Sequence, residues 1–476
     1  MTSVTRRVVV VGNGMAGFRF VQELSSLDTR CAITVIGDEP GGAYNRVQLS
    51  QVLAGAAAPD SIELADHGWY AARGVTLHSA TSVLDIDRRV RRVMLEGRRA
   101  RYRELGYDVL VLATGSRAVL PQLPGLTRPD GRLTHGAVAF RTLADCAEIG
   151  TLAARARSAV VVGGGVLGLE TARALAGLGL PVTVLQRGSR LMDRHLDSEA
   201  SRVLARTLRS FGVTVRTRAS LRGVAGGGRV TGVVLGDGSR LDADLFVLCC
   251  GAAPRTELAR SAGLAAGVGV IVDDQLRSIV DPAIFAIGEC AEHRGRTHGL
   301  VAPSWEQAQV AARVIADPHA AVSYPGSRLV IRLKAAGIEL VTLGSAVTRG
   351  AEIVRFTDTA RGAYCKLVVR DSRLAGAILL GRTEAAGTIT QLFDRGTDLP
   401  ADRSSLLVSS RDAGTAVTDR ATICQCNGVT RAAIRGAWKD GARDTAAVAA
   451  RTRATTGCGT CRDAVEGILG SLAAAS

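Results

Sequence analysis

The chain has 476 residues, of which 22% are charged and 47% are hydrophobic, a balance that excludes disordered and collagen-like proteins. Its length and its 10 cysteines exclude a small disulfide-stapled fold and allow about three domains of roughly 150 residues each. The net charge of +15 makes nucleic-acid binding the first hypothesis to test.

The sequence contains no run of about 18 apolar residues that would span a membrane. The four valines before Gly12 are also too short a stretch for a signal peptide. We therefore expect a cytoplasmic protein with reduced thiols and no membrane partner.

The N-terminal region predicts a strand, a glycine-rich turn, a helix and a second strand. In chain order these are Val8–Val11, Gly12-x-Gly14-x-x-Gly17, Phe18–Leu27 and Ala32–Ile36. The second strand ends at Asp38 and Glu39, about 20 residues past the last glycine, where an acidic side chain would meet a ribose hydroxyl.

The same unit recurs further along the chain, and the two glycine motifs begin 151 residues apart. Its parts are Ala159–Val162, Gly163-x-Gly165-x-x-Gly168, a helix through Leu178, and Val182–Leu185. One such motif could serve packing alone, but two in the same context favour two dinucleotide sites. In each, a pyrophosphate would rest on the helix N-terminus.

Further strands are predicted between and after these units. They are Val90–Leu95, Val230–Leu235, Leu329–Leu333, Tyr364–Val369 and Leu374–Leu380, the last two joined by a turn at Asp371–Arg373. Residues 400–422 have the composition of a linker or surface segment, and the last segment is predicted to be mostly helical.

Residues 6–400 resemble flavoproteins with two dinucleotide-binding domains, the group that contains ferredoxin reductases and the flavin-binding half of nitrite reductase large subunits. The resemblance is carried by both glycine motifs and by Asp38-Glu39-Pro40, Tyr44-Asn45-Arg46, Leu112-Ala-Thr-Gly115, Gly168-x-Glu170 and Ile284-Phe-Ala-Ile-Gly-Glu289. It implies FAD at the first motif and NADH or NADPH at the second. The chemistry would be borne by the flavin, so no catalytic acid or base is assigned.

By this resemblance, Glu39 reads the FAD ribose and Gly288–Glu289 meets the ribityl chain. The full implied FAD set is Gly12, Gly14, Met15, Ala16, Gly17, Asp38, Glu39, Arg46, Gln51, Val83, Ala113, Thr114, Gly115, Gly288, Glu289 and Trp305. The implied NAD(P)H set is Gly163, Gly165, Val166, Gly168, Glu170, Gln186, Arg187 and Gly251.

At three of these positions the assignment to FAD needs a comment. Glu289 stands where many relatives have Asp, although the nitrite-reductase branch commonly has Gly-Glu-Cys. Gln51 stands where ferredoxin reductases often have Lys, which weakens a transfer of their flavin chemistry. Trp305 matches a segment that approaches the flavin ring, and packing in the core is an equal alternative.

The nucleotide preference stays open at this stage. Gln186 and Arg187 follow the second unit's last strand, without the acidic residue that would accept from a ribose 2′-hydroxyl. Arginine there would pair with a 2′-phosphate, but it is equally explained as one of many surface arginines.

Dithiol chemistry at the flavin is not expected, because residues 40–59 contain no cysteine. For Cys249, Cys250 and Cys290 we favour simple packing of small side chains.

Four cysteines near the C-terminus form Cys424-x-Cys426, 31 intervening residues, and Cys458-x-x-Cys461. Four thiolates in two close pairs can hold zinc or a [2Fe–2S] cluster. The flanking residues, Ile423 to Thr430 and Ala454 to Cys461, resemble the bacterioferritin-associated ferredoxin type of domain, which implies the [2Fe–2S] cluster. A hydride delivers two electrons and such a cluster accepts one at a time, so the two cofactors together would split electron pairs.

The expected fold is α/β, with two Rossmann-like domains of the glutathione-reductase type. The expected domains are FAD-binding (1–120 and 248–325), NAD(P)H-binding (121–247), a small α+β closing domain (326–400), a linker (401–420) and a helical [2Fe–2S] domain (421–476).

The domain order resembles the front half of NAD(P)H nitrite reductase large subunits, without cysteines for a sirohaem-linked cluster. It implies an electron-transfer subunit that serves a separate molybdenum-dependent assimilatory nitrate reductase chain. Alternatives are the flavin subunit of a sirohaem nitrite reductase, a ferredoxin or rubredoxin reductase, and a redox-sensing binding protein that is not an enzyme.

The densest basic stretch, Arg88–Arg103, fits a hairpin that turns near Glu96–Gly97. Only Tyr102 interleaves with its arginines, so nucleic acid is not expected as a partner. Residues 420–476 carry seven arginines and one lysine against four carboxylates, a net charge of +4 that would favour docking to an acidic electron acceptor.

Overall fold

A computed structural model describes residues 5–27, 30–97, 101–345, 349–408, 419, 421–424, 427–457, 459 and 461–474. Its first sheet is parallel, in the order β21-β9-β1-β2-β5. These strands are Ile284–Ala286, Val109–Leu112, Arg6–Val11, Cys31–Ile36 and Thr76–His78. The central strands are buried hydrophobic runs, as expected for a parallel sheet covered on its faces.

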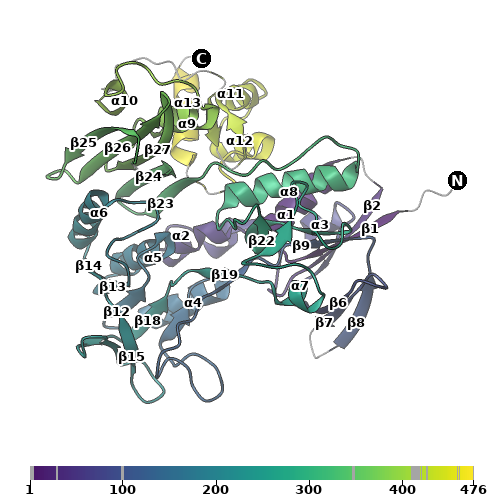
Figure 1. The fold of residues 1–476 in the computed structure, drawn as a ribbon, viewed down its shortest axis with the longest axis horizontal. Coiled ribbons are helices and arrows are strands. Elements are labelled where there is room, and N and C mark those ends of the chain that lie inside the picture. The colour runs from purple at the N-terminus through teal and green to yellow at the C-terminus, as the bar shows by residue number, and fades with distance from the viewer. Residues whose placement is uncertain are drawn as a thin grey trace.

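Helix α1 (Met15–Ser26) follows β1 and packs along α8 (Val301–Ala316), as Figure 1 shows. Strand β21 and helix α8 come from far along the chain, so this layer is built from two separate segments.

The second sheet repeats the plan, in the order β11-β18-β12-β13-β14 and again parallel. Its strands are Ala137–Ala139, Leu245–Leu248, Ala159–Val162, Val182–Gln186 and Val213–Thr217. Its helices are α4 (Leu143–Ala153), α5 (Val166–Gly177) and α6 (Ser198–Ser210). An antiparallel pair, β10 (Ser116–Ala118) with β19 (Ala252–Pro254), connects the two halves.

A third sheet is antiparallel, in the order β23-β24-β27-β26-β25. Its strands are Val330–Ala335, Ile338–Gly344, Arg373–Leu380, Ala363–Arg370 and Glu352–Asp358, and helix α9 spans Ala386–Arg395. The predicted strand pair at 364–380 is confirmed, and Asp371 and Ser372 adopt the left-handed conformation that a tight hairpin turn requires.

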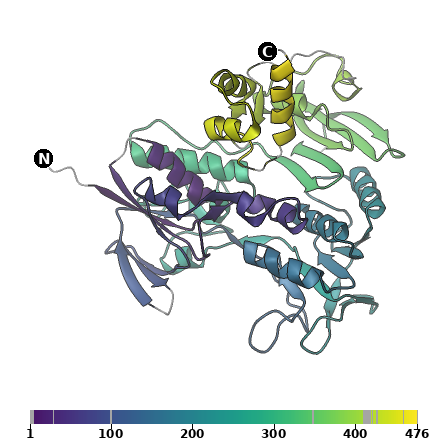
Figure 2. The same cartoon turned by 180° about the vertical axis from the view of Figure 1, so that it is seen from behind.

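The C-terminal segment contains β28 (Thr422–Cys424), β29 (Val429–Thr430), α11 (Arg431–Lys439), α12 (Thr445–Thr452) and α13 (Arg462–Ala474). In both views these helices lie beside the third sheet and above α1 and α8 (Figures 1 and 2). Within the predicted linker, helix α10 (Ser405–Val408) places Leu407 in the core of the third sheet. Residues 409–418 and 420 lie outside the described residues.

The arginine-rich stretch belongs to a small antiparallel sheet of β6 (Ser82–Asp87), β7 (Arg92–Gly97) and β8 (Arg101–Gly106). The predicted hairpin is confirmed, but Glu96 and Gly97 lie within β7, opposite Tyr102 and Arg101, and not in the turn; residues 98–100 lie outside the described residues. Arg92 Nη1 lies 2.6 Å from a carboxylate oxygen of Glu104, so part of this charge is paired on an exposed face.

The remaining helices and strands are shorter. They are β3 (Ala43–Tyr44), α2 (Leu49–Leu53), β4 (Glu63–Ala65), α3 (His67–Ala71), β15 (Leu221–Ala225), β16 (Gly232–Leu235), β17 (Arg240–Asp242), α7 (Glu257–Ser261), β20 (Val270–Val272) and β22 (Ala291–His293). In the part of the chain that the structure describes, no helix is both long and apolar enough to cross a membrane.

Candidate functional site

The first glycine turn joins β1 to α1 and is shaped by close backbone contacts. A Cβ atom added to Gly12, whose φ is +112°, would lie 2.2 Å from the carbonyl oxygen of Ala113. At Gly17 it would lie 2.1 Å from the carbonyl oxygen of Gly12. A Cβ at Gly14 would meet no atom within 4 Å. Two glycines are thus required by packing, and the third leaves open space at the start of the helix.

The second turn, between β12 and α5, is built in the same way. A Cβ on Gly163 would lie 2.2 Å from the carbonyl oxygen of Cys249, and one on Gly168 would lie 1.9 Å from that of Gly163. At Gly165 the added atom again meets nothing within 4 Å. Neither α1 nor α5 has a side-chain N-cap, so backbone N–H groups face both open spaces. Both sites fit a dinucleotide pyrophosphate.

A cavity of about 430 Å³ opens beside the first turn. It is lined by Gly12 and by the predicted residues Asp38, Val83 and Thr114. Arg255 also lines it, with Nη1 2.7 Å from an Asp38 carboxylate oxygen, and Thr114 Oγ1 donates to the Arg255 carbonyl at 3.0 Å. The cavity therefore has an apolar wall and a charged mouth, as an adenosine group requires.

Glu39 is one of two predicted FAD-binding carboxylates that are held by neighbouring side chains. Tyr44 donates to Glu39 Oε2 at 2.7 Å, and Arg46 forms an ion pair with the other oxygen. Arg46 also donates to the Arg141 carbonyl at 3.0 Å. Glu39 and Arg46 are thus brought together as a pair.

Glu289 is the second of these carboxylates, and it contacts both the Ser116 hydroxyl and the guanidinium of Arg141. Just before it, Gly288 passes so close to α1 that an added Cβ would lie 2.7 Å from the Cβ of Ala16. The Gly288–Glu289 segment therefore meets the helix that follows the first turn. Sequence reasoning missed Arg141, which lies 148 positions from Glu289 and carries no local signal.

Gly115 lies just after Ala113, which contacts the first turn, whereas Gln51 lies on α2, which packs against α4 and α5. Gln51 is half-buried on α2 and its carbonyl accepts from the backbone of Ala56 at 2.9 Å. Gly115 has a φ of +66°, and its carbonyl accepts from the Arg255 backbone at 2.9 Å.

Glu170 lies at a junction of three parts of the chain. Its carboxylate accepts from Ser50 Oγ at 2.7 Å and from the Lys334 backbone at 2.8 Å, and its side chain is buried. In this structure both carboxylate oxygens are occupied by protein donors, so its assignment to NAD(P)H stays a prediction.

Four further predicted residues follow or border the second turn. Gln186 Oε1 accepts from the Gly164 backbone at 2.9 Å and closes the turn, whereas Arg187 is exposed. Gly251 has a φ of +104° and accepts from the Val119 backbone at 3.0 Å in the connection between the two halves. Val166 is the first residue of α5.

Trp305 is 2% exposed, and its Nε1 donates to the Met15 carbonyl at 3.1 Å. The structure shows the core-packing alternative for this residue, and a contact with the flavin remains a prediction. It shares one buried cluster with residues of the C-terminal segment and with Met15 of α1.

That cluster also contains Cys424 and Cys461, both buried. The two ends of the cysteine motif therefore meet in one place, and paired soft thiols there fit an iron–sulfur centre. Cys426 and Cys458 lie outside the described residues.

The loop before Cys461 contacts the half of the molecule that contains the first sheet, here called the flavin-side half. Asn45 donates to the carbonyls of Thr456, at 3.2 Å, and Gly457. A Cβ on Gly459 would lie 3.0 Å from Gln48 Nε2. The cysteine-bearing loop thus contacts the segment that leads into α2.

The other thiols fit the packing interpretation. Burial raises the pKa of Cys249 to about 12, and burial also raises the pKa values of Cys250 and Cys290. Neutral, buried thiols are poor nucleophiles.

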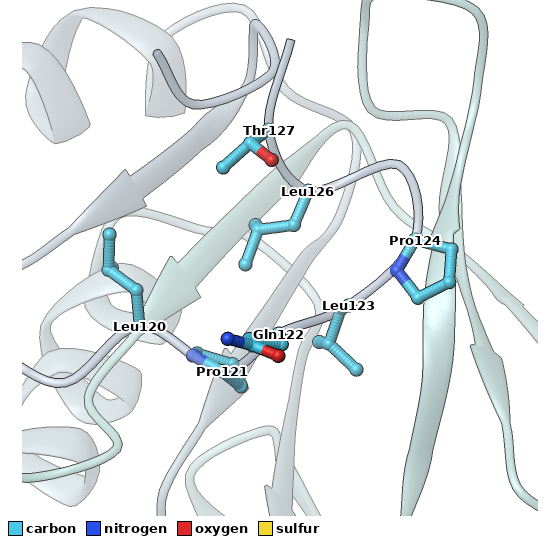
Figure 3. Close-up of a pocket in the computed structure, with 7 residues that line it drawn as sticks. All are labelled: Leu120, Pro121, Gln122, Leu123, Pro124, Leu126 and Thr127. Atoms are coloured by element: carbon cyan, nitrogen blue, oxygen red, sulfur yellow. The ribbon is translucent and has the colours of Figure 1, made fainter. Parts of the chain in front are cut away.

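A separate hollow of about 370 Å³ lies along residues 120–127, where the chain enters the second half. Figure 3 shows its lining, mostly leucine and proline side chains from this one segment. It shares no lining residue with the cavity beside the first turn.

Comparisons with known families divide the chain into three matched parts. Residues 6–314 match the pyridine nucleotide-disulphide oxidoreductase model, residues 330–397 the rubredoxin NAD+ reductase C-terminal domain, and residues 422–471 the BFD-like [2Fe-2S] binding domain. The predicted fold class is confirmed by these matches.

Two curated relatives from Bacillus subtilis (strain 168) are similar over nearly the whole chain. Nitrite reductase [NAD(P)H] is 35% identical over 98% of this chain and 57% of its own length. The assimilatory nitrate reductase electron transfer subunit is 35% identical over 98% of this chain and 59% of its own length. The chain thus spans less than two thirds of each relative.

Among solved structures, the ferredoxin reductase for the CYP199A2 system from Rhodopseudomonas palustris matches with a TM-score of 0.73 and 28% identity. The match covers 83% of this chain and 96% of that one.

Proposed function

Because this chain belongs to the pyridine nucleotide-disulphide oxidoreductase family, we propose that it oxidises NAD(P)H and delivers the electrons to a separate catalytic subunit. The partner that we propose is a molybdenum-dependent assimilatory nitrate reductase, supported by the relative named as an electron transfer subunit of that enzyme. FAD would accept a hydride as two electrons, and a [2Fe–2S] cluster would release electrons singly.

One observation carries this proposal. Cys424 and Cys461 share a buried cluster with Trp305 and Met15, and Met15 is the first residue of the helix after the first glycine turn. The cysteine site is therefore packed against the candidate FAD site, without an intervening domain. Such packing supports transfer within one chain rather than between chains.

Different residues would bind FAD, NAD(P)H and the cluster. The backbone N–H groups that begin α1 would hold the FAD pyrophosphate, and those that begin α5 would hold that of NAD(P)H. Glu39 would accept from the FAD ribose, with Arg46 and Tyr44 fixing its orientation. Arg141 and Ser116 would orient Glu289 toward the flavin side chain. The four cysteines would hold the cluster.

Two coarser features follow the same proposal. The domain boundaries given above stay part of the proposal, and they are supported by sheets formed by residues 6–112 and 284–286, by 137–248, and by 330–380. A cytoplasmic location is supported by six cysteines of the described part of the chain that form no disulfide, Cys31, Cys146, Cys249, Cys250, Cys290 and Cys365.

The proposal is tested by reconstitution with the catalytic subunit of a molybdenum nitrate reductase. We expect NAD(P)H-dependent formation of nitrite from nitrate, and none when this chain is left out. A sirohaem nitrite reductase should be tested in parallel, because one relative is a nitrite reductase of equal identity. If electrons were transferred only to the sirohaem enzyme, the partner would be a nitrite reductase and not a nitrate reductase. No steady NAD(P)H turnover with any one-electron acceptor would favour a redox-sensing protein instead.

Arg187 gives a prediction about the nucleotide. It is exposed beyond β13, where a 2′-phosphate would lie, and no acidic residue occupies that strand end. We expect Arg187→Ala to raise KM for NADPH by about tenfold, the typical loss of one charged hydrogen bond, and to leave KM for NADH unchanged. Arg202→Ala, on the outer face of α6, is the control. An unchanged ratio of the two KM values would show that Arg187 does not read the nucleotide.

The positive C-terminal segment gives a prediction about docking. If its net charge of +4 attracts an acidic partner, the second-order rate of transfer should fall about tenfold or more as salt rises from about 0.01 to about 0.15 M. Stopped-flow measurement at increasing salt gives this slope, and reduction of a neutral dye is the control. A rate insensitive to salt would exclude electrostatic steering.

A further inference from the structure

A buried arginine on α1 connects the flavin-side half to the C-terminal segment. Arg19 is 3% exposed, and its Nη2 forms an ion pair with Glu23 at 2.9 Å. Its Nη1 donates to Gln22 at 3.0 Å, and its guanidinium lies 5.1 Å from the ring centroid of Trp305. A charge this deeply buried is costly unless it is paired, so its partners define its role.

A second arginine reaches the same carboxylate from the opposite side of the interface. Arg453 ends α12 with a left-handed φ of +64°, and its Nη1 lies 2.7 Å from Glu23 Oε1. The same nitrogen donates to Gln22 at 3.3 Å. Glu23 therefore pairs with one arginine from each side, which fixes the C-terminal segment on α1.

Asn427 lies between these arginines and the cysteines. Its Oδ1 accepts from Arg19 Nη1 at 3.3 Å. Its Nδ2 lies 2.5 Å from the Arg453 carbonyl, 3.2 Å from Thr456 Oγ1 and 3.6 Å from the sulfur of Cys424. One amide thus touches a cysteine sulfur, the loop that leads to the second cysteine pair, and the buried arginine of α1.

We propose that Asn427 is a positioning residue that sets the reduction potential of the cluster and couples it to α1. This inference rests on the proposed function, because it requires a cluster on Cys424. An N–H group directed at a ligand sulfur stabilises the additional negative charge of the reduced centre and raises its potential. Arg19 strengthens the effect, because its charge polarises the amide through Oδ1.

The test is a redox titration of the iron-loaded full chain with a chemical reductant and mediators, followed by EPR. Asn427→Leu removes all four polar contacts of the side chain at similar volume, and Asn427→Asp keeps an acceptor for Arg19 but loses the donor to sulfur. Both should lower the equilibrium constant for cluster reduction by about tenfold, which is about 59 mV for a one-electron couple. Neither NAD(P)H nor the partner takes part, so failure here is separable from failure of the proposed function.

Two further variants keep the result interpretable. Ser471→Ala removes an exposed hydroxyl of α13 that donates to the Gly467 carbonyl and makes no contact with Asn427, and it should leave the potential within error of the wild type. Arg19→Met keeps Asn427 and should lower the potential by a smaller amount, which preserves a test if the Asn427 variants do not assemble a cluster. The proposal is overturned if the Asn427 variants shift the potential no more than Ser471→Ala does, or if Arg19→Met leaves it unchanged.

Discussion

Replacing Cys461 by serine is expected to abolish electron delivery to the partner while reduction of a hydride-accepting dye by NAD(P)H continues. Cys461 is buried with Cys424 in the cluster that also holds Trp305, so its loss removes a ligand from an enclosed site. Mutation of a residue that only supports a metal ligand typically costs about 10–100-fold in activity. Loss of the ligand itself should lower the rate of transfer by more than this. Paired assays with the dye and with the catalytic subunit measure the two activities.

The matched control for this experiment is Cys31→Ser. Cys31 is a half-buried free thiol at the start of β2 and does not belong to the C-terminal cysteine motif. The control should keep both activities, the iron content and the labile sulfide. If Cys461→Ser also kept full transfer to the partner, the cluster would lie outside the electron path.

The second large effect is expected from Gly14→Ala, which should yield a folded chain with weakened FAD binding. The added Cβ meets no protein atom within 4 Å, so the polypeptide itself tolerates it. The same atom would project into the space where a pyrophosphate must approach the backbone. At the usual overpacking cost of about 1–3 kcal/mol, FAD affinity should drop about tenfold or more. The flavin absorbance per chain measures this.

Two alanine variants show whether the effect is specific. Gly150→Ala adds a Cβ in open space on α4, and it should keep full flavin and gain about 0.5–1 kcal/mol of stability from helix propensity. Gly165→Ala should keep flavin but raise KM for NAD(P)H. Full flavin content in Gly14→Ala would contradict the assignment of FAD to the first turn.

The sequence predicted those parts of the molecule that depend on neighbouring residues. Both glycine turns and their flanking strands were predicted because a strand, a tight turn and a helix start are all local patterns. Val83 was named only through the family resemblance, and it does line the cavity beside the first turn.

Contacts between distant segments could not be predicted in this way. Asn45 and Thr456 are 411 positions apart, and no local pattern indicates that the cysteine-bearing loop rests on that segment. Arg255 follows Gly251 by four positions and could have been noticed, but its pairing with Asp38 depends on the β10–β19 connection. Leu407 lay in a polar segment, and burial against the third sheet outweighed that composition.

Several of the arginines that make the chain basic form ion pairs within it. Arginines such as Arg19 and Arg46 are partly or fully buried in ion pairs within the chain, and Arg92 pairs across an exposed hairpin. Some of the arginines therefore serve ion pairs within the chain, and the net charge of +15 is the excess of basic over acidic residues that such pairs leave.

The most direct measurement is an anaerobic titration of the loaded chain with NADPH or NADH alone, followed by both flavin absorbance and EPR. If electrons pass from the nucleotide through FAD to the cysteines, bleaching of the flavin should be accompanied by the EPR signal of a reduced [2Fe–2S] centre. The Cys461→Ser chain should show the bleaching without that signal. Bleaching in the wild type with the cluster remaining oxidised, and reducible only by an added chemical reductant, would contradict the account.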